Sequence, residues 1–278
     1  MKKMISRRSF LAAAAVSVAA LALTACGGSA SSAASSVASS AASSEAASSA
    51  AAELTTVEAG KLTMATNATF PPYEMTTDSG ELEGIDVDTA KAIAEKLGLE
   101  LQIDDMDFDA ALLSVQQGKA DIVMAGVTVT DERKAVMDFS DSYATGIQSI
   151  IVPNDSDIAS PDDLAGKKIG TQRGTTGYIY CSDDFGEDSV VAYDSGLTAV
   201  QALNNGQVDA VVIDNAPATE YVAANPGLKV LDTSYAEEDY AIGMAKGSAL
   251  EDAVNKALEE LKADGTLQAI VDKYINAN

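Results

Sequence analysis

QGKADIVMAG (residues 117–126) and NGQVDAVVID (residues 205–214) are two copies of one pattern. In each copy a glycine follows a helix-periodic stretch, an aspartate comes three residues after the glycine, and apolar residues complete the pattern. Gly118 and Gly206 are expected to end helices, because glycine readily adopts the left-handed dihedrals found just past a helix. A helix followed by a buried strand is therefore predicted twice.

The segments around the two copies also correspond. Residues 60–66 and 166–171 are typical of opening strands, and residues 101–103 and 190–193 are typical of second strands. A helix is predicted over Asp86–Gly98 from the spacing of its apolar residues. Each half then follows the order β-α-β-α-β, which predicts an α/β fold of two lobes, each a mainly parallel sheet flanked by helices.

The last part of the chain predicts two further helices. Ser248 and Glu251 have the spacing of a capping box, which indicates that a helix begins there. Gly265 is expected to end this helix, and Thr266 to begin the second one.

The first 25 residues have the pattern of an export signal. A basic segment (residues 2–8) precedes an apolar stretch (residues 10–25) that is shorter than the about 20 residues of a membrane span. Leu-Thr-Ala-Cys (residues 23–26) resembles the lipobox of bacterial lipoproteins, which implies that Cys26 carries lipid and begins the mature chain. The paired arginines also resemble a twin-arginine signal, so Sec and twin-arginine export both remain open.

Residues 26–53 combine the lipidated cysteine with a segment made almost entirely of serine and alanine. Such a segment lacks the large apolar residues that drive folding, so we expect a flexible tether. With Cys26 lipidated, no disulfide is expected, and Cys181 is predicted to be a partly buried apolar residue.

Composition excludes several classes of function. The chain has 42 acidic and 18 basic residues and no histidine, for a net charge of −24. This charge argues against nucleic acid as a partner, because phosphate backbones require basic surfaces. The RGTTG segment (residues 173–177) lacks the Gly-Lys-Ser/Thr ending of a phosphate loop, so no nucleotide is expected. We expect no cofactor, no metal and a monomeric protein.

Polar residues follow the apolar run in both copies of the repeated pattern. Thr128, Thr130 and Arg133 follow the first run, and Asp214 ends the second. Ligands of open α/β sheets bind beyond the carboxyl ends of the strands, so these residues are expected to face each other across a cleft. An α-amino acid requires such a pair of charges, a cation for its carboxylate and an anion for its ammonium.

Structural interpretations of the same residues remain open. Arg133 has possible surface partners in Asp131 and Asp138. Asp214 is equally suited to cap the helix that follows it. Glu74, in the PPYEM segment, is interpreted as structural.

Two long segments carry a resemblance to a known family. GELEGIDVDTAKAIAEKLG (residues 80–98) and DIVMAGVTVTDERKAVMDFSDSY (residues 121–143) resemble motifs of the bacterial family 3 solute-binding proteins, the amino-acid receptors of ABC importers. The tail YAIGMAKGS…LKADGT…Y (residues 240–274) is similar as well. Thr89 departs from the family, which usually has an aliphatic residue there.

The resemblance implies a type II periplasmic-binding-protein-like fold. Lobe 1 would comprise residues 54–148 and 242–278, and lobe 2 residues 149–241. Two crossover segments, near Gln148–Val152 and Tyr240–Met244, would join the lobes.

The resemblance also implies roles for individual residues. Arg133 would hold the ligand carboxylate, helped by Thr128 and by the backbone of Ala125 and Gly126. Asp214 would bind the α-ammonium.

Further residues would hold the rest of the ligand. Phe70 and Phe108 would enclose its apolar stem, Thr176 would add a contact from a helix N-terminus, and Asn67 and Gln172 would reach its side chain. The full set of expected ligand-binding residues is Asn67, Phe70, Phe108, Ala125, Gly126, Thr128, Arg133, Gln172, Thr175, Thr176 and Asp214.

The implied function is to bind a free amino acid in the cleft between the lobes, close on it and deliver it to an ABC importer permease. The protein would act outside the cytoplasm, anchored by its N-terminal lipid to the cell membrane of a Gram-positive surface. Some relatives for basic amino acids carry an aspartate at the position of Asn67, so the neutral asparagine weakens the expectation of a basic ligand without excluding it. Neutral polar, cystine-like and basic amino acids all remain open as ligands. The alternatives are a cleft enzyme of the same fold, a dehydratase of a cyclic acid, and a ligand-sensing surface lipoprotein.

Overall fold

The structure is a computed structural model that describes residues 54–275. The expected signal (residues 1–25), the lipidation site Cys26 and the tether lie outside the described residues. Within the described part, no helix has the length and apolar character needed to cross a membrane.

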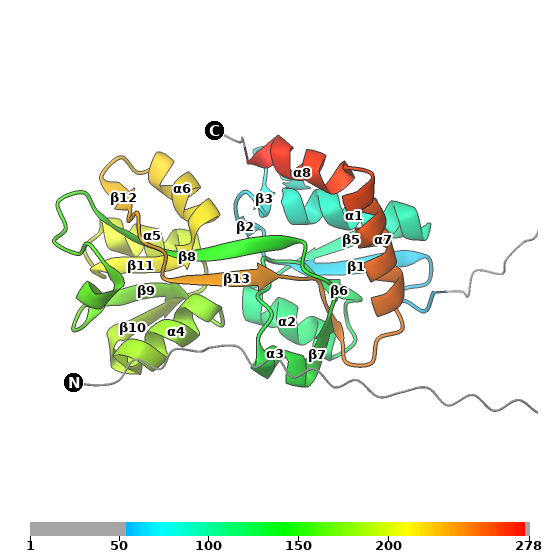
Figure 1. Ribbon diagram of the computed structural model, residues 1–278, viewed down its shortest axis with the longest axis horizontal. Helices are drawn as coiled ribbons and strands as arrows, with labels where there is room; N and C mark the ends of the chain where they lie inside the picture. Colours follow the sequence, from blue (N-terminus) through cyan, green and yellow to red (C-terminus); the bar gives the residue numbers. More distant parts are fainter. Residues whose placement is uncertain (1–53, 276–278) are drawn as a thin grey trace, which may run out of the picture. The chain divides into compact units, whose positions relative to one another are not determined.

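The first of two large sheets has five strands in the order β5-β1-β6-β14-β7 (Figure 1). β1 runs parallel to β5 and β6, whereas β14 runs antiparallel to β6 and β7. The predicted parallel arrangement is thus confirmed for the first three strands, and two strands from later in the chain extend one edge. The strands are β1 (Lys61–Thr66), β5 (Glu100–Asp105), β6 (Ile122–Val123), β7 (Met137–Phe139) and β14 (Gly243–Ala245).

Helices cover both faces of this first sheet. Five of the six residues of β1 are buried, as a strand with a covered sheet face on either side requires. Helices α1 (Ile85–Leu97), α7 (Glu251–Ala263) and α8 (Thr266–Tyr274) share one core cluster with β1. Helix α2 (Phe108–Gln116) contributes to a second cluster with β1 and β6.

The second sheet has the order β10-β9-β11-β8-β12, with β13 paired to β8. β9 runs parallel to β10 and β11, and the strands that pair with β8 are antiparallel to it. Its strands are β8 (Ala144–Pro153), β9 (Ile169–Gln172), β10 (Val190–Tyr193), β11 (Ala210–Asp214), β12 (Leu228–Val230) and β13 (Ala236–Tyr240).

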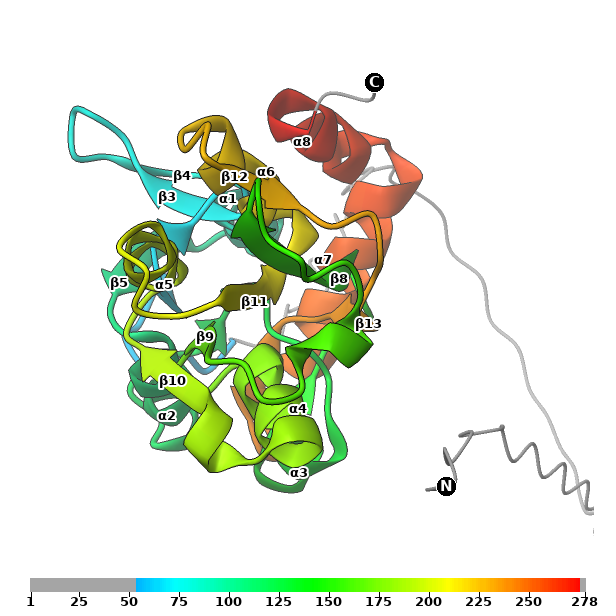
Figure 2. The ribbon, with the colours of Figure 1, turned by 90° about the vertical axis from the view of Figure 1, so that its left-hand side faces the viewer.

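Helices α5 (Gly196–Asn204) and α6 (Asn215–Ala223) share a core cluster with β11, while α4 (Thr176–Phe185) belongs to a separate cluster. Figure 2 looks onto this sheet from its end, with α5 and α4 on opposite sides. Short 3-10 helices cover Pro161–Leu164 and Glu187–Ser189. Cys181 of α4 is fully buried, so its predicted burial is confirmed and complete.

Two strands run between the sheets, β8 and β13, and they lie side by side (Figure 1). β8 pairs with β13 over Ala144–Gln148 and with β11 from Gln148 onward. The chain leaves β13 at Tyr240 and enters β14 of the first sheet at Gly243, inside the crossover predicted there. The other crossover begins earlier than predicted, because β7 ends at Phe139 and β8 already starts at Ala144.

Glycines end the helices where predicted. Gly98 caps α1 with a φ of 71°, and Gly118 and Gly206 follow α2 and α5 with φ values of 64° and 67°. The capping box predicted at Ser248 and Glu251 is wrong. α7 begins only at Glu251, and the Ser248 hydroxyl accepts a hydrogen bond from the Leu250 N–H at 3.2 Å in the turn before the helix.

A small three-stranded sheet beside the first lobe was not predicted. It is formed by β2 (Thr69–Phe70), β3 (Glu74–Thr76) and β4 (Leu82–Glu83). In its register Phe70 lies opposite Glu74. This pairing places Glu74 beside Phe70, at the junction of the two lobes.

Candidate functional site

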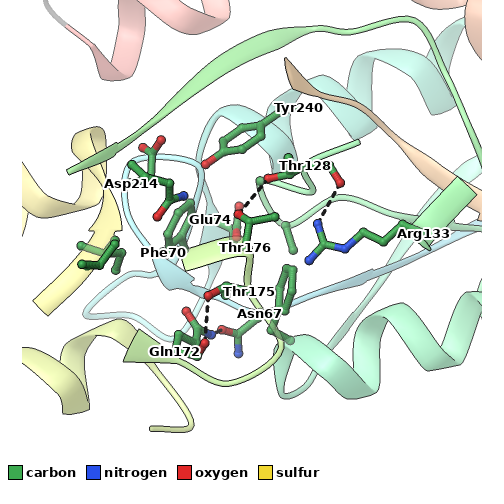
Figure 3. Close-up of a pocket in the computed structure, with 16 residues that line it drawn as sticks. Asn67, Phe70, Glu74, Thr128, Arg133, Gln172, Thr175, Thr176, Asp214 and Tyr240 are labelled. Carbon is green, nitrogen blue, oxygen red and sulfur yellow. Dashed lines mark hydrogen bonds between the residues drawn. The ribbon is translucent and has the colours of Figure 1, made fainter. Parts of the chain in front are cut away.

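A cavity lies between the two lobes (Figure 3). Thr130, which was expected to face the cleft, does not line it, whereas the whole expected ligand-binding set does: Asn67, Phe70, Phe108, Ala125, Gly126, Thr128, Arg133, Gln172, Thr175, Thr176 and Asp214. The lining also includes residues that we did not place in the site: Glu74, Gln148, Val212, Ile213 and Tyr240.

Arg133 is the buried cation of the cavity. It belongs to α3 (Asp131–Val136), which starts where Thr130 accepts a hydrogen bond from the Arg133 N–H. Its guanidinium donates to the carbonyl of Thr128 at 2.8 Å and to that of Gly174 at 3.1 Å, and lies 5.4 Å from the center of the Phe108 ring. Burial lowers the pKa of Arg133, and the charge of Glu238 opposes this shift.

One of the two surface partners considered for Arg133, Asp138, is engaged elsewhere. Asp138 accepts hydrogen bonds from Lys246 and from the Gly247 N–H, both at 2.6 Å, and these bonds lower its pKa. Arg133 itself is only 8% exposed, so a surface ion pair does not describe its position.

Asp214 is the buried carboxyl on the second lobe. It caps α6 by accepting the Ala216 N–H at 3.0 Å, and its other oxygen accepts the Ile147 N–H at 2.7 Å. The helix-capping interpretation of Asp214 is therefore confirmed, although the residue also lines the cavity. Burial raises the pKa of Asp214 to about 6, against the effect of these hydrogen bonds.

Aromatic side chains form one end of the cavity. Phe70 stacks on Tyr73 with ring centers 5.7 Å apart, and Tyr73 meets Tyr240 edge to face at 5.4 Å. Gly126 lies against this group with a φ of 55°. A Cβ atom at Gly126 would come within 2.8 Å of the Phe70 ring and 3.2 Å of the Tyr240 ring, so the packing requires glycine.

Two amides join the lobes at another point of the wall. Gln172 donates to Asn67 Oδ1 at 2.9 Å, and the Asn67 amide donates to the carbonyl of Met106 at 2.8 Å. Thr175 caps α4 and its hydroxyl donates to the carbonyl of Gln172 at 2.8 Å. Asn67 and Gln172 thus hold each other in place at the cavity.

Asp86 holds the loop that carries Gly126. Its two oxygens accept the Gly126 N–H at 2.9 Å and the Tyr143 hydroxyl at 2.7 Å. The Gly126 N–H, which we expected to help hold a ligand carboxylate, is therefore engaged. Burial raises the pKa of Asp86 to about 6.

Glu74, which was interpreted as structural, also lines the cavity. It is fully buried, and its polar partner is a second buried acid, the carboxyl group of Asp86. Burial, followed by the charge of Asp86, raises its pKa well above the usual range. The available signal was an acidic residue four positions after Phe70 in an otherwise apolar segment.

Two α/β lobes joined by a pair of strands, with a buried cavity between them that carries charges of both signs, define a two-lobed solute-binding protein. The chain belongs to the bacterial extracellular solute-binding proteins, family 3, whose model matches residues 62–277. The resemblance drawn from the motifs is thereby confirmed.

Known proteins of this kind are similar over most of the chain. The L-cystine-binding protein TcyJ of Escherichia coli K12 is 34% identical over 225 residues, which cover 80% of this chain and 85% of TcyJ. The arginine-binding extracellular protein ArtP of Bacillus subtilis is 34% identical over 219 residues, 77% of this chain and 86% of ArtP.

Solved structures agree with the fold. The arginine-, lysine-, histidine-binding protein ArtJ of Geobacillus stearothermophilus has a TM-score of 0.75 at 34% identity, covering 78% of this chain and 96% of ArtJ. An ancestral arginine-binding protein bound to arginine has a TM-score of 0.74 at 44% identity, covering 78% of this chain and 99% of its own. The predicted two-lobed fold is therefore confirmed.

Proposed function

We propose that this protein binds a free α-amino acid between its lobes and delivers it to the permease of an ABC importer. The observation that carries the proposal is that Arg133 and Asp214, opposite in charge, line one buried cavity from different lobes. A zwitterion satisfies both at once, because a guanidinium pairs with a carboxylate and a carboxyl group accepts from an ammonium.

The aromatic residues hold the apolar stem of the ligand. Phe70 and Phe108 line the cavity from separate elements of the first lobe, and the Arg133 guanidinium lies over the Phe108 ring. Contact with these rings favours a ligand that has methylene groups between its charged ends.

The side chain of the ligand is assigned to Glu74. A buried carboxyl group whose polar partner is another buried acid, Asp86, is costly, and a ligand with a guanidinium or ammonium group at its far end relieves that cost. Asn67 and Gln172 add amide groups to the lining of the cavity. Among the amino acids left open by the sequence, we therefore propose a basic one. Relatives named for arginine and histidine binding agree with a basic ligand, whereas other relatives are named for cystine and glutamine binding.

Closure follows from contacts that already join the lobes. Arg133 donates to Gly174, and Gln172 donates to Asn67, so residues that line the cavity also connect its two sides. We assign lobe 1 to residues 54–148 and 242–278 and lobe 2 to residues 149–241. A ligand that contacts both lobes stabilises the closed arrangement by its differential affinity for it.

Delivery requires the protein to stay near the permease. We propose that residues 1–25 are removed as a signal peptide, that Cys26 carries the lipid, and that residues 26–53 tether a monomeric folded part to the cell membrane.

A second candidate function is supported by Glu74, whose pKa burial raises well above the usual range. A carboxyl group that stays protonated near neutral pH is suited to donate a proton to a leaving group, as a dehydratase of a cyclic acid requires. Turnover of a cyclic hydroxy acid, followed by the appearance of its dehydrated product, would favour this enzyme over the receptor.

The proposal is tested by isothermal titration calorimetry on protein that has been unfolded and refolded to remove any carried ligand. The panel comprises arginine, lysine, histidine, glutamine and cystine. We expect micromolar or tighter binding of a basic amino acid, equivalent to about −8 kcal/mol or more. Equal and weak heats for the whole panel would overturn the assignment.

A further inference from the structure

Glu238 is a buried carboxylate that stands behind the cavity wall. It lies on β13, one of the two strands that run between the sheets, and is 6% exposed. It does not line the cavity itself, but it contacts three residues that do.

These contacts converge on a single oxygen. Glu238 Oε2 accepts from the Thr176 hydroxyl at 3.0 Å, from the Thr128 hydroxyl at 3.1 Å and from the Gln148 amide at 3.0 Å. Thr128 follows a strand of the first lobe, Thr176 begins α4 of the second, and Gln148 lies on β8. One carboxylate on a connecting strand thus contacts both lobes and the other connecting strand.

The chemistry of the groups fixes the direction of these bonds. An ionised carboxylate only accepts hydrogen bonds, and a threonine hydroxyl has a single proton to donate. The protons of Thr128 and Thr176 are therefore both directed at Glu238. Their oxygens lie 3.4 Å apart, and their remaining lone pairs are the groups left to face the cavity.

We infer that Glu238 sets the hydrogen-bonding polarity of the cavity wall, since it takes the hydroxyl protons of Thr128 and Thr176 and leaves their oxygens as acceptors. The inference rests on the proposed function and revises the expected part of these two threonines. They do not donate to the ligand carboxylate, which relies on Arg133. The hydroxyl oxygens of Thr128 and Thr176 instead accept hydrogen bonds from the ligand, and its α-ammonium group is the donor next to the carboxylate.

The same carboxylate has a second effect on the site. Arg133 is 8% exposed, and a buried guanidinium is costly unless a negative charge offsets it. Glu238 supplies the largest of the charge effects that support ionised Arg133. Removing Glu238 without replacing its acceptor thus frees two hydroxyl protons beside an Arg133 that has lost the largest of the charges that support it.

The test compares L-arginine with L-argininamide, which lacks the free carboxylate. Calorimetry gives the ratio of the two dissociation constants for the wild type and for Glu238→Met, Glu238→Gln and Glu237→Met. In Glu238→Met the freed hydroxyls can donate to a carboxylate, so the preference for the acid is expected to rise about tenfold, as one additional charged hydrogen bond predicts. Glu238→Gln keeps a carbonyl acceptor and is expected to change the ratio clearly less, by about threefold or under. Glu237 is exposed on the same strand, so Glu237→Met is expected to leave the ratio unchanged.

Equal loss of both ligands in Glu238→Met, with an unchanged ratio, would overturn the inference, because a merely structural residue predicts that result. An equal rise in Glu238→Met and Glu238→Gln would also overturn it and assign the effect to charge alone. Failure of the wild type to bind either compound would overturn the proposed function and the inference together.

Neutron diffraction of the wild type with arginine tests the inference without any variant. The deuterons on the hydroxyls of Thr128 and Thr176 are expected to point at Glu238 Oε2. A deuteron on either hydroxyl directed at the arginine carboxylate would overturn the inference while leaving the proposed function intact.

Discussion

The guanidinium of Arg133, in the first lobe, donates a hydrogen bond to the carbonyl of Gly174, in the second lobe, with an N···O distance of 3.1 Å. Gly174 belongs to the loop between β9 and α4, so the residue proposed to hold the ligand also touches the opposite side of the cleft. Ligand binding and contact between the lobes therefore share one side chain.

Substitution of Arg133 should abolish useful binding. Arg133→Ala leaves a ligand carboxylate without its buried partner, which is expected to cost about 2–5 kcal/mol. Arg133→Lys should lose a large part of the same affinity, since an ammonium cannot reproduce the forked guanidinium contacts. Calorimetry with arginine measures both losses.

The matched control is Arg173→Ala. Arg173 is a neighbouring, exposed arginine that pairs with Asp194 at 3.5 Å, and its removal should leave affinity within about twofold, as expected for a surface ion pair. Arginine binding to Arg133→Lys at wild-type strength would contradict the role of the guanidinium.

The affinity for a basic ligand should increase as the pH rises. Burial and the charge of Asp86 raise the pKa of Glu74, so at low pH a cationic ligand meets a neutral group and gains less. Glutamine has no cationic side chain but shares the contacts of the α-carboxylate and ammonium. The difference between arginine and glutamine affinities, measured from pH 5 to 8, therefore reports the effect of protonating Glu74 separately from the effects of protonating Asp214 and Asp86.

Glu74→Gln should remove that difference and weaken arginine binding by about 1–3 kcal/mol, the cost of losing a hydrogen bond to a charged group. Glu81→Gln, on the exposed turn of the same small sheet, serves as control and should behave as the wild type. An arginine affinity that stays level with pH in the wild type would exclude Glu74 as the partner of the ligand side chain.

Gly126→Ala tests the packing of the aromatic end of the cavity. The added Cβ would collide with Phe70 and Tyr240, and the residue has a φ of 55°. Gly118→Ala imposes a similar backbone strain, with a φ of 64°, but its Cβ meets no atom within 4 Å. Both variants should be destabilised, by about 1 kcal/mol from the dihedral angle alone, and only Gly126→Ala should also lose ligand affinity. Equal affinities in the two variants would show that the cavity tolerates the added methyl group.

The free protein should become more stable as the pH falls from 7 to about 5. The pKa values of Asp86 and Asp214 are raised to about 6 in the folded chain from 3.8 in the unfolded one. Between these values the folded state binds more protons, so the free energy of unfolding decreases as the pH rises through this range, and Glu74, whose pKa is raised in the same direction, adds to the decrease. Asp86 and Asp214 each account for about 3 kcal/mol across the full window.

Urea unfolding at several pH values measures this dependence. Asp214→Asn keeps a good helix cap and should reduce the slope by up to about one proton. Stability that rises steadily from pH 5 to 7 in the wild type would contradict the raised pKa values of these two buried carboxyl groups.

The repeated pattern predicted most of the fold because it reflects local forces. Glycine dihedrals end α1, α2 and α5 at the predicted places, and apolar runs give the parallel strands. The capping box at Ser248 failed because a sequence motif does not specify which backbone N–H its hydroxyl meets, and here that is Leu250.

Prediction of the cavity lining succeeded where a residue follows a strand, as Arg133 and Asp214 do. It failed for Glu74 and Tyr240, which are brought to the cavity by pairing between segments. Glu74 reaches it through the register of β2 and β3, opposite Phe70, and Tyr240 through the pairing of β13 with β8. Long-range pairing of this kind leaves little mark on a single segment of sequence.

The central claim is that one ligand joins Arg133 to Asp214 through its carboxylate and its ammonium. The most direct test is calorimetric titration of the refolded protein with L-arginine and with agmatine, which has the same guanidinium and stem but no carboxylate. We predict micromolar or tighter binding of arginine and a loss of at least about 100-fold for agmatine, equivalent to about 2.8 kcal/mol. Binding of agmatine as tightly as arginine would show that Arg133 does not hold a carboxylate and would contradict the account.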